Sequence, residues 1–125
     1  MATRDDRGDV SLQVVLLTPV VLLLVLVSVQ AALWYHAVQL ADNAAADGAA
    51  SAARRGADAA AGTAAVAEFV REAGGRLLAT EVVNDGNEMV VSATIHVPSV
   101  VPGWPDAVTR RATAPVERLT ESGRG

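Results

Sequence analysis

The chain has no cysteine and no lysine, and its aromatic residues are two Trp, one Tyr and one Phe. Without cysteine it can form no disulfide, no thiolate nucleophile and no cysteine-ligated metal site. The net charge is −4, and basic residues cluster only as the pairs Arg54-Arg55 and Arg110-Arg111. Because nucleic-acid binding needs a basic face, that class of function is excluded as well.

Charge is absent between Asp9 and Asp42, where the chain has no Asp, Glu, Lys or Arg. Val and Leu dominate the first part of this stretch, so it lacks the polar face that an ordinary core helix carries. As a helix, Val10 to Tyr35 would span roughly 39 Å, against about 30 Å for the hydrocarbon core of a bilayer. The sequence therefore predicts a single-pass membrane protein, which leaves about 90 residues for one small domain outside the lipid.

The flanks of the apolar run predict its orientation. Arg4 and Arg7 precede the run and its far side begins with acidic residues. The positive-inside rule then places the N-terminus in the cytoplasm and the C-terminal domain outside it. Trp34 and Tyr35 lie where an aromatic pair anchors a helix at the outer interface. The expected location is the cell membrane, with the lipid bilayer as the first partner.

Three residues within the run stand out. Pro19 removes a backbone hydrogen bond and bends a helix, which is either a tolerated kink or a point of local melting during assembly into a fibre. An amide in hydrocarbon seeks a partner, and Gln13 lies about one turn inside the inner boundary, so it is a candidate helix–helix contact. Gln30 is expected near the outer interface, hydrated by water.

The motifs in and around the run are similar to those of a known family. They are Arg7-Gly8 followed by Asp9-Val10-Ser11-Leu12-Gln13, then Leu17-Thr18-Pro19, and the exit Leu33-Trp34-Tyr35-His36-Ala37. On these residues the chain resembles the TadE-like family, the pilin-like and pseudopilin-like proteins of tight-adherence (type IVb) pilus systems. The alanine-rich segment 44–49 and the segment 115–120 look like those of actinobacterial members. In the family, a prepilin peptidase cuts after the Gly that ends a short basic leader.

The resemblance implies roles for several residues. Gly8 and Asp9 would flank the peptidase cut, and Gln13 and Pro19 would belong to the assembly surface of the stem. Other pilin-like subunits and pilus assembly proteins would be the partners. The family usually has Glu where this chain has Gln13, and that carboxylate is thought to pair with the free amine of a neighbouring subunit. Gln13 can accept a hydrogen bond but cannot neutralise an amine, which fits a minor or accessory subunit better than a major one.

Two other interpretations of the run stay open. One is a signal-anchored extracytoplasmic binding domain unrelated to pili. The other is a small secreted protein, released by cleavage near Val29-Gln30-Ala31. A cleavable signal has an apolar core of roughly 7–15 residues, and Val10 to Leu33 is far longer, so retention in the membrane is favoured.

Beyond the membrane the sequence predicts a small head after the stem. The expected divisions are a cytoplasmic leader (1–8), a transmembrane and extracytoplasmic stem helix (9–55), a break (56–62), the head (63–119) and a disordered tail (120–125). This stem also carries a stripe of small residues, which is expected to pack against another pilin-like stem, with a solvated alanine-rich stalk as the alternative. The stripe comprises Val38, Ala41, Ala45, Ala49 and Ala52.

The head pattern is one amphipathic helix (64–73) followed by three strands, with the helix expected on the apolar face of the sheet. Thr63 is the expected N-cap of the helix and Gly74-Gly75 its end. Its apolar face comprises Val66, Phe69, Val70, Ala73 and Leu77. Strands are predicted over Leu77–Asn84, Glu88–Val97 and Ala107–Ala114, with Asp85-Gly86 central in the first hairpin. The fold class is therefore α+β, with a long N-terminal transmembrane stem helix, a short amphipathic helix and a small three-stranded antiparallel sheet.

No catalytic, cofactor or metal site is predicted. His36 and His96 lie far apart in the sequence, and the Ser and Thr residues have no supporting base, so an enzyme is not expected. Trp104, within Pro-Gly-Trp-Pro, is expected to cover the end of the small core, with a partner-binding anchor as the alternative. Together with the absence of a predicted catalytic site, the resemblance to the TadE-like family implies a non-enzymatic membrane subunit of a tight-adherence pilus.

Overall fold

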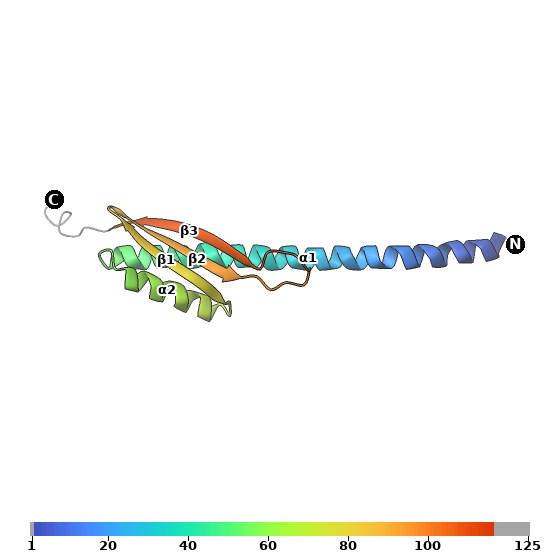
Figure 1. Cartoon of the computed structure of the whole chain (residues 1–125), viewed down its shortest axis with the longest axis horizontal. Helices are drawn as coiled ribbons and strands as arrows, with labels where there is room; N and C mark the ends of the chain where they lie inside the picture. The colour runs from blue at the N-terminus through green and yellow to red at the C-terminus, as the bar shows by residue number, and fades with distance from the viewer. Residues whose placement is uncertain (1, 117–125) are drawn as a thin grey trace.

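The computed structural model describes residues 2–116, with side chains from Asp9 onward. Figure 1 shows a long helix with a small helix-and-sheet unit packed along its C-terminal half. The α+β class predicted from the sequence is confirmed. The predicted disordered tail (120–125) lies outside the described residues. The elements are α1 (Ala2–Arg54), α2 (Ala59–Glu72), β1 (Leu77–Asp85), β2 (Glu88–His96) and β3 (Ala107–Pro115).

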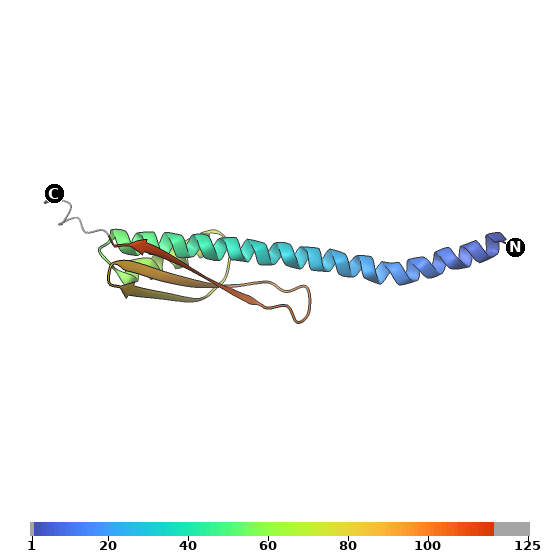
Figure 2. The same ribbon diagram turned by 90° about the horizontal axis from the view of Figure 1, so that it is seen from above.

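Helix α1 runs without interruption from the apolar run into the head. Alanine, the residue with the highest helix propensity, dominates its C-terminal part, and Gly48 does not end it. Pro19 lies inside the helix as well. Figure 2 shows α1 bending in its blue N-terminal part, which contains Pro19. Proline therefore kinks this helix without breaking it.

The strands form an antiparallel meander in the order β1-β2-β3. Every second side chain of β2 points into the core, as its alternating pattern predicted. These buried residues are Met89, Val91, Ala93 and Ile95, with Val97 just beyond the strand. The first hairpin differs from the prediction by one residue, because Asp85 pairs with Glu88 and leaves Gly86 and Asn87 as the central pair. Gly86 has φ +72°, the backbone that the first central residue of a type II′ turn requires.

Helix α1 is the main cover of the sheet, which was not predicted. The expected arrangement placed the short helix on the apolar face, but α2 contacts β1, whereas α1 lies against β2 and β3. Figure 1 shows the strands running along α1 with α2 beside it. The stem helix and the head therefore share one core. Its buried residues include Ala41, Ala44, Ala45 and Ala49 of α1, Val66 and Val70 of α2, Val91, Ala93 and Ile95 of β2, and Val108 of β3.

The alanine stripe of α1 is buried against the head, three of its alanines in this core and Ala52 in a smaller cluster with Ala53 and Met89. The prediction that it contacts another stem is therefore wrong, and so is the alternative of a solvated stalk. Its four alanines are at most 1 % exposed: Ala41, Ala45, Ala49 and Ala52. Small side chains are needed because α2 approaches α1 closely. A Cβ atom on Gly48 would lie 2.5 Å from Val66 Cγ2 and 3.1 Å from the carbonyl oxygen of Gly62.

Helix α2 begins earlier than predicted. Asp58, not Thr63, is its N-cap, and the Asp58 carboxylate accepts hydrogen bonds from the N–H groups of Ala60 and Ala61 at 3.0 and 3.3 Å. The Thr63 hydroxyl instead donates to the carbonyl of Ala59, one turn back, at 3.1 Å. Gly62 lies inside α2 and is buried, because its lack of a side chain permits the close approach to α1. The predicted break (56–62) is thus too long.

The predicted end of this helix at Gly74-Gly75 is confirmed. Gly74 has φ +77°, its N–H donates to the carbonyl of Arg71, and the N–H of Gly75 donates to the carbonyl of Val70. These two bonds form a Schellman motif, which turns the chain from α2 into β1.

In the described part of the chain, two exposed ion pairs lie on the surface of the head. Arg71 Nη2 lies 2.6 Å from Glu68 Oε1 on α2, and Arg110 Nε lies 2.8 Å from Asp42 Oδ1, which links β3 to α1. The hydrogen bond from Arg71 lowers the pKa of the Glu68 carboxyl and raises the pKa of the guanidinium. Exposed pairs of this kind add little stability, so the head depends on its apolar core.

Candidate membrane stem and its junction with the head

The N-terminal part of α1 contains a segment, residues 10–29, that the head leaves exposed; we call it the bare stem. Its large apolar side chains are 37–66 % exposed. Among the described residues, α1 is the one helix long and apolar enough to cross a membrane, and its most apolar stretch is not buried by protein. Roughly 20 residues at about 1.5 Å each span about 30 Å, the thickness of the hydrocarbon core. The chain is a single-pass membrane protein.

Gln30 marks the upper end of the bare stem, and its predicted hydration is wrong. Its side chain is 0 % exposed. The amide oxygen accepts hydrogen bonds from the N–H groups of Val100 and Val101 at 2.7 and 3.1 Å, and the amide nitrogen donates to the carbonyl of Pro98 at 3.1 Å. Three bonds to the connection between β2 and β3 therefore satisfy this amide. The head reaches down to residue 30, so the exposed apolar segment is shorter than the predicted span to Tyr35.

The aromatic residues at the junction divide between the head and the surface. Trp34 is partly buried against the core, and this is the role that was expected of Trp104. Trp104 lies instead in the β2–β3 connection, partly exposed and outside the core clusters. Tyr35 is 65 % exposed. The predicted pair of interfacial anchors, Trp34 and Tyr35, thus faces two different environments just above the bare stem.

The candidate cleavage position lies at the other end of α1. Gly8 and Asp9 are both within the helix, and the Asp9 side chain is exposed immediately before the bare stem. Asp9 lies about two turns inside α1, which begins at Ala2, so its carboxylate does not cap the start of the helix. The position predicted for the peptidase cut is thus next to the first apolar residue of the stem.

The two predicted assembly residues, Gln13 and Pro19, both belong to the bare stem. Gln13 is exposed, and the head lies at the far end of the helix from it. One residue before Pro19, the Thr18 hydroxyl donates to the carbonyl of Val14, which satisfies an acceptor near the kink. A shallow groove lies on this face. It is lined by Val14, Leu17, Thr18, Val21 and Leu22.

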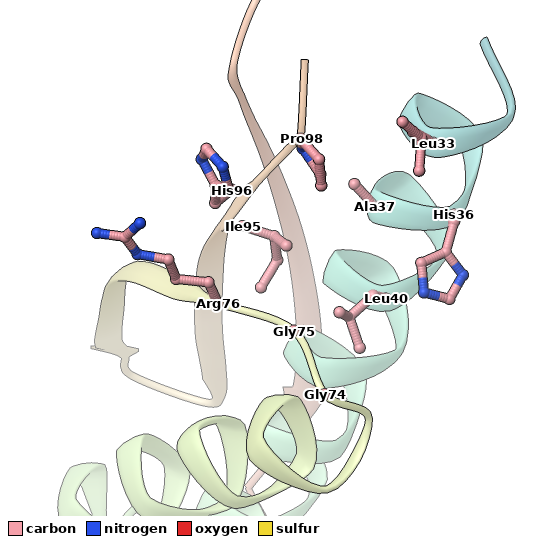
Figure 3. A pocket seen from close by; sticks show the side chains of 10 residues that line it. All are labelled: Leu33, His36, Ala37, Leu40, Gly74, Gly75, Arg76, Ile95, His96 and Pro98. Carbon is pink, nitrogen blue, oxygen red and sulfur yellow. The ribbon is translucent and has the colours of Figure 1, made fainter. Parts of the chain in front are cut away.

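A pocket of about 250 Å³ lies where α1, the end of α2 and β2 meet (Figure 3). It brings His36 and His96 to one cavity, which sequence separation did not predict, with Arg76 at its rim. Figure 3 shows the two imidazole rings on opposite sides, with the apolar side chains of Ile95 and Leu40 between them. Within residues 9–116, no group of three or more His, Asp or Glu side chains could hold a metal ion.

Comparison of the sequence with protein-family models gives a match over the stem. The family model described as "TadE-like protein" matches residues 8–50, which include the bare stem, Gln30 and most of the alanine stripe. No curated protein and no solved structure matches the chain. The resemblance drawn from the motifs is confirmed over this segment. Residues 8–50 of this single-pass membrane protein are thus similar to the TadE-like family.

Proposed function

We propose that this chain is a non-enzymatic, pilin-like or pseudopilin-like subunit that takes part in the assembly of a tight-adherence (type IVb) pilus. The observation that carries the proposal is the bare stem within the TadE-like segment 8–50. A helix of bilayer length, exposed on all sides, is free to associate with other helices in the membrane. Its partners are other pilin-like subunits and pilus assembly proteins.

The amides of α1 support an assembly role for Gln13. Apolar helices gain no hydrophobic energy from pairing in lipid, so they associate through close packing and polar contacts. Gln30 already has three hydrogen bonds to its own head. Within the bare stem, Gln13 is the one amide, and it can bond a neighbouring subunit for about 1 kcal/mol. Because it is neutral, it cannot pair with a subunit's terminal amine as a carboxylate would, and this supports a minor or accessory role.

The proposed topology has residues 1–8 as a cytoplasmic leader and the head outside the cytoplasm. Arg4 and Arg7 on the short side support this orientation. A prepilin peptidase would cut between Gly8 and Asp9, at the foot of the bare stem. Release by signal peptidase near Ala31 is less favoured, because it would separate Gln30 from the connection that it holds.

Terminal sequencing of the protein extracted from membranes tests this topology. We expect a chain that starts at Asp9, and a Gly8→Val variant that keeps its leader. Ala2→Val, which places the same new side chain elsewhere in the leader, should be cut like the parent. An intact N-terminus in the parent would favour a signal-anchored domain unrelated to pili, and a start near Ala32 would favour a secreted protein.

Cross-linking tests the association of stems. Because the chain has no cysteine, one introduced thiol can carry a maleimide-linked photocross-linker at a single position. From Leu17→Cys, one turn above Gln13, we expect adducts with other pilin-like subunits in native membranes. Gln13→Leu should reduce these adducts, whereas Gln39→Leu, an exposed amide on the head side of α1, should not. Adducts that are absent from Leu17→Cys, or unchanged by Gln13→Leu, would contradict the assembly role.

A further inference from the structure

The connection between β2 and β3, residues 97–106, extends beyond the sheet and follows α1 toward its N-terminus (Figure 2). We call it the junction loop. Its position is set by Gln30, which bonds the Pro98 carbonyl and the N–H groups of Val100 and Val101. The bare stem ends at Val29. The loop is therefore fastened to the helix one residue above the segment that fills the bilayer.

The composition of the junction loop is unusual for a turn in water. From Val97 to Pro105 it has no charged residue. Val100 is 41 % exposed, Val101 and Trp104 are partly exposed, and Pro98, Pro102 and Pro105 are exposed. This exposed apolar surface lies at the end of the head that is nearest the bare stem.

The backbone of the loop also suits a medium that is poor in water. Its three prolines have no N–H group to satisfy. Of the other N–H groups, those of Val100 and Val101 donate to Gln30 and that of Trp104 donates to the carbonyl of Val101 at 3.2 Å. The Ser99 hydroxyl donates to that same carbonyl at 2.8 Å. Backbone groups near hydrocarbon must find partners within the protein, and most of the N–H groups of this loop do so.

We propose that the junction loop is a membrane anchor, seated in the lipid interface beside the point where α1 leaves the bilayer. Trp104 lies at headgroup depth, where an indole with an apolar body and one polar N–H is favoured. Val100 and Val101 contact the upper acyl chains. Gln30 acts as a positioning residue that holds the loop at this depth. The head thereby has two attachments to the membrane, the stem and the loop, which fix its tilt relative to the bilayer.

Depth-dependent fluorescence quenching tests this anchor on the full chain in phosphatidylcholine vesicles. Trp34→Phe leaves Trp104 as the one tryptophan. Vesicles of phospholipid brominated high on the acyl chain should quench its emission more than vesicles brominated near the chain end. The quenching should be the same when protein is diluted tenfold in lipid. Equal emission in brominated and plain vesicles would overturn the proposal, and so would quenching that changes with dilution, because the loop would then contact a second copy of the chain.

The role of Gln30 is tested in the same Trp34→Phe background. Gln30→Leu removes the three hydrogen bonds and should weaken the quenching by shallow bromine and shift the Trp104 emission to the red. Gln39→Leu, which changes an exposed amide on the same helix, should leave both signals unchanged. Equal signals from the two variants would overturn the positioning role. The measurement on Trp104 itself needs no change at Gln30, so it decides the anchor even if Gln30→Leu does not fold. The anchor proposal depends only on the stem spanning the membrane. If the chain proved not to associate with pilus subunits, the quenching result for Trp104 would still stand.

Discussion

The two halves of α1 are equally helical and both rich in apolar residues, yet they are built for different surroundings. Val and Leu cover the bare stem on every side and are exposed. In the half that carries the head, residues 30–54, most of the buried positions are alanine. Acyl chains adapt to any apolar side chain, whereas a second helix or sheet at close range leaves room for only a methyl group. Side-chain size, rather than hydrophobicity, thus separates the lipid-facing half from the protein-facing half.

A charge placed in each half should give the largest difference. Leu23→Arg puts a guanidinium near the middle of the bare stem, at a cost of about 3 kcal/mol for membrane insertion. We expect much less of this variant in the membrane fraction after carbonate extraction. Asn43→Arg, on an exposed position of the other half, should remain in the membrane like the parent. Equal retention of the two variants would show that residues 10–29 are not the part that lipid surrounds.

A larger side chain, in contrast to a charge, should be harmful in the half of α1 that packs against the head. Ala45 is fully buried in the head core, so Ala45→Leu overpacks it and should destabilise the head by about 1–3 kcal/mol. Its neighbour Ala46 is exposed, and Ala46→Leu should change the stability by less than about 0.5 kcal/mol. Thermal unfolding in detergent, followed by circular dichroism, measures both. A similar effect of the two changes would mean that the stripe does not pack as the structure shows.

The smallest expected effect concerns α2, the helix that buries the alanine half. Asp58→Ala removes the N-cap and should lower the free energy of unfolding by about 1 kcal/mol. Thr63→Ala removes a hydroxyl from an exposed position inside the helix and should be within about 0.5 kcal/mol of the parent. Urea unfolding of both variants compares them. If Thr63→Ala proved the more destabilising, the helix would begin where the sequence pattern alone placed it.

The features that follow from local rules could be predicted. The long apolar helix of membrane-spanning length, the alternation in β2 and the glycine stop after α2 each depend on residues close in the chain, and all three are confirmed. The N-cap at Asp58 was also within reach, because Asp followed by Ala-rich sequence is a helix start. The predicted break (56–62) covers this start, because glycine is a poor helix former and Gly62 closes that segment. In fact Gly62 lies in α2 because its missing side chain fits against α1.

The predictions that proved wrong concern features that depend on contacts between residues far apart in the sequence. The stripe of alanines is compatible with a neighbouring stem, with solvent or with the head of the same chain, and the pattern of small residues is the same in all three cases. Gln30 and Val100 are 70 positions apart, and nothing in the sequence around either residue indicates that they form a hydrogen bond. The same holds for His36 and His96, which share one pocket without forming a ligand pair.

The amino-acid order alone requires a helix in lipid, because a long uncharged run of Val and Leu is insoluble in water whatever the rest of the chain does. Where that lipid segment ends is a matter of tertiary contacts. The head binds Gln30 and withdraws it from the membrane interface, and the core takes up the alanines that would otherwise be available to another subunit. Those outcomes depend on which surfaces meet when the chain folds back along its own stem. The residues near Gln30 or near the alanines in the sequence do not determine which surface that is.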